Sequence, residues 1–215
     1  PGLNGPYGAA VAVARVLGLD AQRIAHAIGI AGSLSSGLLA FTRSAQGAMV
    51  KRLHLGRAAE GGVLAASLAA DGFTGPTTVL EGRAGFLKAF CNESDPALLT
   101  AGLDKEWASS TILLKRFACH ITAHCAVQAI MEMRAKNGIT GNDVAAIQID
   151  GSRRMSTVNN IPNPPDILIG QFSIPFCVSV AMYRNAVDPA SFDDAATRDA
   201  AIMALASKVK MTAVP

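Results

Sequence analysis

Two short basic clusters hold three of the four histidines of this 215-residue chain. The first cluster is the run from Lys51 to His54, and the second extends from Lys115 through His120 to His124. Lysine amines bind carboxylates as compact point charges, and histidine exchanges protons near neutral pH. The residue types in these clusters therefore predict a site that holds a small anionic molecule and moves a proton.

Simpler readings of the same residues exist. Lysine and arginine side by side at the edge of a helix usually face solvent, and His54 is equally well explained as a residue packed in the turn before Gly56. His120 and His124 are four residues apart, as two metal ligands on one helix face would be. No glutamate accompanies them in the spacing of a zinc-binding helix, so a structural or catalytic pair is favoured and no metal is predicted.

The four cysteines have no spacing typical of a metal site or of a redox pair. Cys119 and Cys125 lie close to the histidines, but no base with an orienting carboxylate accompanies them, which favours packed thiols over nucleophiles. Reduced, buried thiols are typical of a cytoplasmic protein.

The basic clusters belong to a longer ordered series of motifs, and this series resembles the MmgE/PrpD family. That family includes 2-methylcitrate dehydratases, cis-aconitate decarboxylases and iminodisuccinate epimerases. The resemblance extends from about residue 5 to about residue 185 and implies that the chain corresponds to an internal portion of a full-length member. It is carried by Gly5–Ala10, Gly37–Leu39, Lys51–Val63, Gly72–Pro76 and Phe172–Phe176.

The resemblance also implies roles for individual residues. His120 is the candidate acid or base and Lys115 its catalytic partner, while Lys51, His54 and His124 are candidate substrate-binding residues. In relatives, the matching positions line a pocket between a helical domain and a lid domain. The chain departs from many relatives at position 118, where alanine replaces proline and leaves the subfamily open.

Three functional hypotheses follow. The first is a cofactor-independent lyase that dehydrates or decarboxylates a small tricarboxylic acid, with 2-methylcitrate dehydratase as the reference activity. The second is an epimerase of an iminodisuccinate-like dicarboxylate, which needs two bases on opposite faces of the substrate. The third is a catalytically incomplete piece that serves in dimerisation or as a lid. The resemblance further implies a homodimer that needs no cofactor.

Composition excludes several other classes of function. The net charge of +3 is small and dispersed, and aromatic residues make up only 5% of the chain, which argues against nucleic-acid binding. Arg15 interrupts the apolar stretch 9–19, which is shorter than the roughly 20 residues of a membrane span. The glycines form no nucleotide-binding motif.

The elements that must position the clusters change in character near residue 108. Helical patterns dominate before it, and we expect helices over 8–17, 57–70, 83–90 and 96–101, with another helix that Asp20 caps. After it we expect helices over 121–136, 173–183 and 195–208, and strands over 144–150 and 209–214. The sequence thus predicts a mainly α protein, with an incomplete helical-bundle domain over 1–108 and an α+β lid domain over 109–215.

Overall fold

The structure, a computed structural model, describes residues 2–214 apart from the side chain of Arg43. The chain forms two compact units, each with a hydrophobic core of its own. The first unit comprises Pro1–Arg43 and Met49–Ile112, and the second comprises Ser44–Ala48 and Leu113–Pro215. The short segment Ser44–Ala48 therefore packs with residues that are distant from it in sequence.

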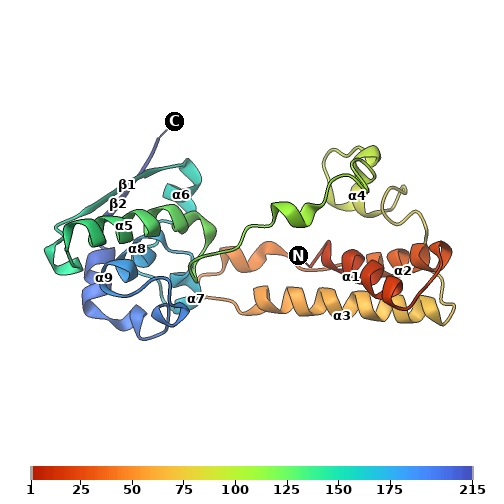
Figure 1. The fold of residues 1–215 in the computed structure, drawn as a ribbon, viewed down its shortest axis with the longest axis horizontal. Helices are drawn as coiled ribbons and strands as arrows, with labels where there is room; N and C mark the ends of the chain where they lie inside the picture. Colours follow the sequence, from red (N-terminus) through yellow and green to blue (C-terminus); the bar gives the residue numbers. More distant parts are fainter. Residues whose placement is uncertain (1, 215) are drawn as a thin grey trace. The chain divides into compact units, whose positions relative to one another are not determined.

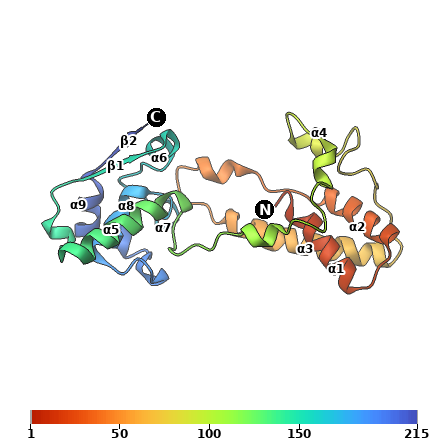
Figure 2. The ribbon, with the colours of Figure 1, turned by 45° about the horizontal axis from the view of Figure 1, so that its top comes forward.

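Three helices that pack side by side build the first unit: α1 (Gly5–Val16), α2 (Ala21–Ser33) and α3 (Val50–Ala70) (Figures 1 and 2). Among the described residues, the buried side chains of their shared core are alanines, apart from Ile30. Small residues allow the helix axes to approach closely. A Cβ placed on Gly62 of α3 would lie 2.6 Å from the backbone nitrogen of Ala10 in α1.

The ends of these helices follow from their sequences. Asp20 accepts a hydrogen bond from the backbone N–H of Arg23 at 2.8 Å, which caps α2 as predicted. Gly72 has a φ of +87° just after α3, a conformation that glycine adopts without steric cost.

The predicted start of α3 at Arg57 was wrong. The helix begins at Val50, so Lys51 and His54 lie within its first two turns and His54 is not in a turn before Gly56. Gly56 does not end the helix. A glycine inside a helix costs about 1 kcal/mol relative to alanine, and the burial of the α3 face against α1 and α2 offsets this cost.

The remaining elements of the first unit are short. They are α4 (Phe86–Phe90) and the 3-10 turns η1 (Leu39–Arg43), η2 (Pro96–Leu99) and η3 (Ala108–Thr111). Tyr7 of α1 contacts Phe86 edge to face, with ring centroids 5.4 Å apart. This contact holds α4 against α1.

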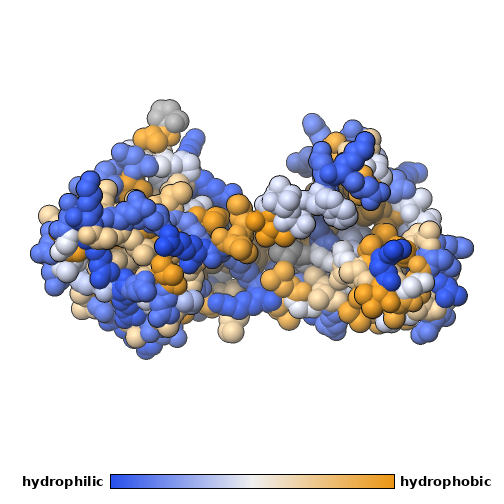
Figure 3. Space-filling model, viewed as in Figure 1, coloured by the Kyte–Doolittle hydropathy of each residue, from blue (hydrophilic) through white to orange (hydrophobic). Residues whose placement is uncertain are grey.

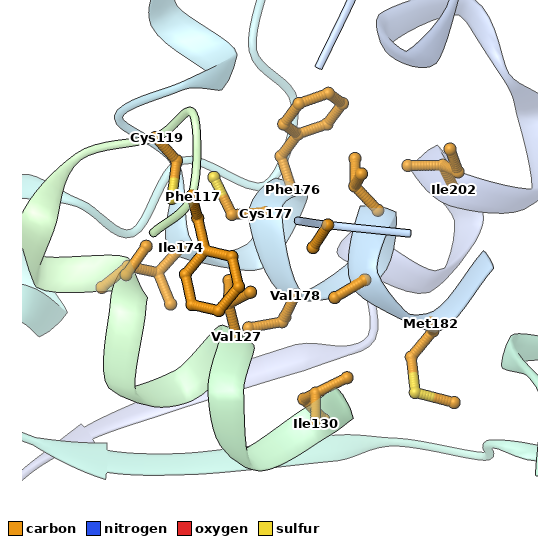
Figure 4. Packing of buried hydrophobic residues seen from close by; sticks show 14 of the residues in the cluster. Phe117, Cys119, Val127, Ile130, Ile174, Phe176, Cys177, Val178, Met182 and Ile202 are labelled. Atoms are coloured by element: carbon orange, nitrogen blue, oxygen red, sulfur yellow. The ribbon is translucent and has the colours of Figure 1, made fainter. Parts of the chain in front are cut away.

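The second unit is built around α8 (Ile174–Tyr183), a helix that is buried on every side from Ile174 to Met182. The helices α5 (His124–Asn137) and α9 (Ala200–Ala206) pack against it. Figure 4 shows Phe117, Val127 and Phe176 among the side chains of this core.

A small parallel sheet completes the second unit. Its strands are β1 (Ile147–Gly151) and β2 (Val209–Ala213), paired in a register that places Ile147 opposite Val209. Short helices connect these elements: α6 (Arg153–Val158), α7 (Ile167–Gly170), and the 3-10 turns η4 (Ile121–Ala123), η5 (Gly141–Asp143), η6 (Pro189–Ser191) and η7 (Ala196–Arg198).

The predicted fold class is confirmed: the protein is mainly helical, with a two-stranded parallel sheet in its C-terminal part. The helix expected over 195–208 is broken into η7 and the shorter α9, because Asp199 leaves the helical conformation to cap α9 through the N–H groups of Ala201 and Ile202. The two compact units are defined by the contacts between residues, which do not identify family domains. The assignment of 1–108 to a helical-bundle domain and of 109–215 to a lid domain therefore stays a prediction.

Hydrophobic side chains also reach the surface of the first unit, as Figure 3 shows beside the hydrophilic ones. Val16 at the end of α1 is 87% exposed. In the described part of the chain, every helix is too short or too polar to cross a lipid bilayer.

The close approach of α1 and α3 gives a first prediction. Gly62→Ala forces a methyl group into the backbone of Ala9 and Ala10, and we expect this overpacking to destabilise the chain by about 1–3 kcal/mol. Gly56→Ala on the same helix meets open space and should stabilise the chain by about 0.5–1 kcal/mol, since alanine is the better helix former. Urea unfolding followed by circular dichroism measures both effects. Shifts of the same sign in the two variants would contradict the packing argument.

Candidate active site

His120 lies on the second unit at the entrance to η4 and α5. Its backbone N–H donates to the carbonyl of Gln171 at 2.7 Å. Its ring lies beside the ring of Phe172, with centroids 5.2 Å apart and planes inclined by 31°. The turn that follows α7 therefore holds both the backbone and the ring of His120.

A third contact fixes the rotation of the His120 ring. Nδ1 lies 2.8 Å from the hydroxyl oxygen of Thr122, and the backbone N–H of Thr122 points at the same nitrogen from 3.4 Å. These two contacts orient the imidazole ring relative to η4.

Lys115 lies in the same segment as His120. Its ammonium group donates to the carbonyl of Cys119 at 3.2 Å, and the residue is exposed. A hydrogen bond from the Cys177 thiol lowers the pKa of Cys119, and the positive charge of Lys115 acts in the same direction. Burial raises the pKa of Cys177 instead. Cys119 therefore loses its thiol proton more readily than Cys177 does.

His124 begins α5 and contributes differently. Its ring meets Phe117 edge to face, with centroids 5.1 Å apart. Its Nε2 is buried, and no hydrogen-bond partner for this atom exists in the part of the chain that the structure describes. An unpaired buried nitrogen is costly, so a water molecule or a ligand group would find a ready donor or acceptor there.

The other two predicted residues lie on the first unit. Lys51 is exposed on the first turn of α3. His54 is half-buried one turn later, where its ring contacts Phe41 at 5.6 Å between centroids. His54 and Arg57 line a hollow of about 260 Å³. Lys115, His120 and His124 thus form one group within the second unit, and Lys51 and His54 form another within the first.

Sequence reasoning missed three residues that shape the second group. Thr122 and Phe172 contact the His120 ring, and Asp166 anchors the segment before α3. The carboxylate of Asp166 accepts from Ile169 N–H, which caps α7, and from Gly47 N–H, both at 2.8 Å. The position of Thr122, two residues after His120, could have indicated their contact from the sequence. The pairing of Gly47 with Asp166, 119 positions later, could not.

The second unit also contains a larger cavity of about 560 Å³ between α5 and β1. Its walls are mostly apolar, with Ile130, Ile147 and Met182 among them, and they include none of the five candidate residues. Such walls do not suit a carboxylate, so this cavity is not the candidate site. Across residues 2–214, no three histidine, cysteine or acidic side chains gather in an arrangement that would hold a metal ion.

Comparison with known proteins identifies relatives over most of the chain. Residues 1–99 match the MmgE/PrpD N-terminal domain and residues 117–215 match the MmgE/PrpD C-terminal domain. A cis-aconitate decarboxylase from Aspergillus terreus is 32% identical over 199 residues, which cover 82% of this chain and 39% of that protein. The human cis-aconitate decarboxylase is 32% identical over 136 residues, covering 62% of this chain and 27% of the human protein. The chain thus spans about two fifths of the length of the Aspergillus protein and about a quarter of the length of the human protein.

The double role of Asp166 gives a second prediction. Asp166→Ala leaves the N–H groups of Gly47 and Ile169 without their acceptor, and we expect a loss of about 1–3 kcal/mol in stability of the second unit. Amide hydrogen exchange at Gly47 and Ile169 should accelerate together. The matched control is Asp188→Ala, which removes one exposed cap bond, to Ala190 N–H, and should cost less. Unchanged exchange at Gly47 would rule out the anchoring role.

Proposed function

Because the chain belongs to the MmgE/PrpD family, we propose that it supplies catalytic and substrate-binding residues of a cofactor-independent lyase that acts on a small tricarboxylic acid. The observation that carries this proposal is the oriented ring of His120 together with the ammonium group of Lys115, which donates to the carbonyl of Cys119, the residue before His120. Proton transfer at a carbon next to a carboxylate requires a positioned acid or base and a cation that stabilises the developing negative charge.

The names of the relatives make cis-aconitate the first substrate to test. In its decarboxylation, the bond from the methylene carbon to its carboxylate breaks and carbon dioxide leaves. The electron pair moves into a new carbon–carbon double bond, the original double bond shifts its electrons to the far carbon, and that carbon takes a proton. The reaction therefore needs an acid at one carbon and cations that hold the remaining carboxylates.

The proposed roles follow from this chemistry. His120 donates the proton, Lys115 and Lys51 each bind a carboxylate, and His54 and His124 contribute further polar contacts. Dehydration of 2-methylcitrate uses the same parts in another order, since a base removes a proton beside a carboxylate before hydroxide leaves. It is the second reaction to test. We further propose that the protein acts in the cytoplasm as a homodimer.

The role of His120 gives a third prediction. We expect His120→Gln to lower kcat about 10²–10⁴-fold, since glutamine keeps a similar size but cannot carry the proton. His124→Ala should reduce kcat less and stability more, because it removes the contact with Phe117. Turnover of cis-aconitate and of 2-methylcitrate measures the first effect, with circular dichroism as the folding control. Near-normal kcat in His120→Gln would show that another residue carries the proton.

The two lysines give a fourth prediction. Lys51→Ala or Lys115→Ala should each remove a charge-assisted contact worth about 1.5–3 kcal/mol, which corresponds to roughly 10- to 150-fold in substrate affinity. Arg52→Ala, next to Lys51 in the same helical turn, is the matched control and should leave the affinity unchanged. Isothermal titration with tricarballylate, a stable tricarboxylate, measures binding without turnover. Equal affinities for Lys51→Ala and Arg52→Ala would remove Lys51 from the site.

A further inference from the structure

We propose that Cys119 and Cys177 form an oxidisable pair of thiols, a modification site at which a peroxide cross-links the segment before His120 to α8. Cys119 directly precedes His120, and Cys177 lies in the first half of α8. Both side chains belong to the hydrophobic core of the second unit, and the Cys177 thiol forms a hydrogen bond with Cys119. Figure 4 shows the two sulfur atoms beside each other in this core.

The environment of this pair differs from that of the other two cysteines. Cys91 and Cys125 are exposed, whereas Cys119 is 4% exposed and Cys177 is fully buried. A buried thiol without a reactive neighbour packs as an inert apolar group. Here each thiol has the other as its neighbour, and a disulfide forms only between cysteines that are already close. The fold thus brings together two sequence-distant thiols in the arrangement from which an S–S bond can form.

The two thiols differ in acidity, which gives each a separate role. The hydrogen bond from Cys177 lowers the pKa of Cys119, and the positive charge of Lys115 acts in the same direction. Burial raises the pKa of Cys177, so this thiol keeps its proton. Thiolates rather than thiols attack peroxides. Cys119 is therefore the residue that reacts first, and Cys177 is the residue that completes the disulfide.

The reaction with hydrogen peroxide takes two steps. The Cys119 thiolate attacks one peroxide oxygen, an S–O bond forms as the O–O bond breaks, and the departing hydroxide takes up a proton to become water. The Cys177 thiol then attacks the sulfur of the Cys119 sulfenic acid. An S–S bond forms as the S–O bond breaks, and the hydroxyl leaves with the Cys177 proton as a second water. The two thiols lose two electrons, and the peroxide is reduced to two waters.

The disulfide acts on the segment that carries His120. An S–S bond is shorter than a contact between two thiols, so one of the two segments must move when the bond forms. Helix α8 is buried over nearly its whole length, whereas the segment before His120 includes the exposed Lys115. The Cys119 segment therefore moves, and with it the carbonyl that accepts from Lys115 and the N–H that donates to Gln171. An effect on turnover rests on the proposed function, because it acts through His120.

The test starts from the double variant Cys91→Ser/Cys125→Ser, in which the buried pair holds the remaining thiols of the chain. Two further substitutions in this background separate the roles of the pair. Cys119→Ser removes the thiol that reacts first. Cys177→Ser removes the second thiol but keeps a similar size and a donor for the Gly170 carbonyl, which the Cys177 thiol contacts at 3.4 Å. Circular dichroism checks that each variant is folded.

Each protein is treated with hydrogen peroxide and then with dithiothreitol. Peptide mass spectrometry identifies the disulfide, and dimedone traps a sulfenic acid. Nitrogen-15 NMR of the His120 ring reports a change at the candidate site without any need for turnover, and kinetics on cis-aconitate report kcat.

We expect peroxide to join Cys119 to Cys177 in the double variant, to shift the His120 ring resonances and to lower kcat roughly 10²-fold, the size of effect that a small misplacement of a catalytic group has. Dithiothreitol should reverse all three changes, because it reduces a disulfide but not a sulfinic acid. Cys119→Ser should show none of them, and Cys177→Ser should stop at the Cys119 sulfenic acid.

Two results would overturn the inference: no Cys119–Cys177 disulfide after peroxide, or a disulfide that leaves the His120 resonances unchanged. A reduced protein that turns over neither cis-aconitate nor 2-methylcitrate would overturn the proposed function instead. The mass and NMR results would still decide the inference in that case, because neither depends on turnover.

Discussion

The hydrogen bond from His120 N–H to the carbonyl of Gln171 joins the candidate acid to the centre of the second unit. Gln171 opens the turn between α7 and α8, and this turn is fixed from both sides. The amide of Asn159 donates to the Phe172 carbonyl at 2.9 Å, and the hydroxyl of Ser173 caps α8 through Phe176 N–H at 3.0 Å. If the turn moved, the partner ring of Phe172 and the backbone acceptor of His120 would move together.

The turn is held by polar groups inside an apolar core, which is a demanding arrangement. Asn159 is 2% exposed and Ser173 is fully buried, so each lost bond would leave a polar atom without water. The hydroxyl of Ser173 accepts a hydrogen bond from Phe176 N–H and donates one to the Ile161 carbonyl. Such a network specifies one conformation more strictly than apolar packing does, because a shifted backbone breaks several bonds at once.

How much of this was readable from the sequence depends on whether the determinants are local. The cap of α2 at Asp20, the helix over 173–183 and the alternation near Ile147 depend on neighbouring residues, and the structure confirms them. The strand expected over 144–150 begins only at Ile147, because pairing with β2 begins at Ile147 opposite Val209, and the partner strand is distant in sequence. The clustering of Lys115, His120 and His124 within ten residues could be predicted, whereas the bond between Gly47 and Asp166 joins segments that only the folded chain brings together.

That distant bond lies within the second unit and joins Gly47 to the start of the short helix α7. Asp166, the N-cap of α7, accepts the hydrogen bond from Gly47 N–H, and the C-terminal end of α7 leads into the turn that accepts the hydrogen bond from His120 N–H. A helix of four residues is only about 6 Å long, so both tasks depend on one small element. Lys51 follows Gly47 by four residues in the sequence. A Cβ at Gly47 would collide with the Asp166 carboxylate and with Leu168, so only glycine permits this anchor. Gly47, four residues before Lys51, is therefore required for a steric reason, which the charges of the cluster alone do not explain.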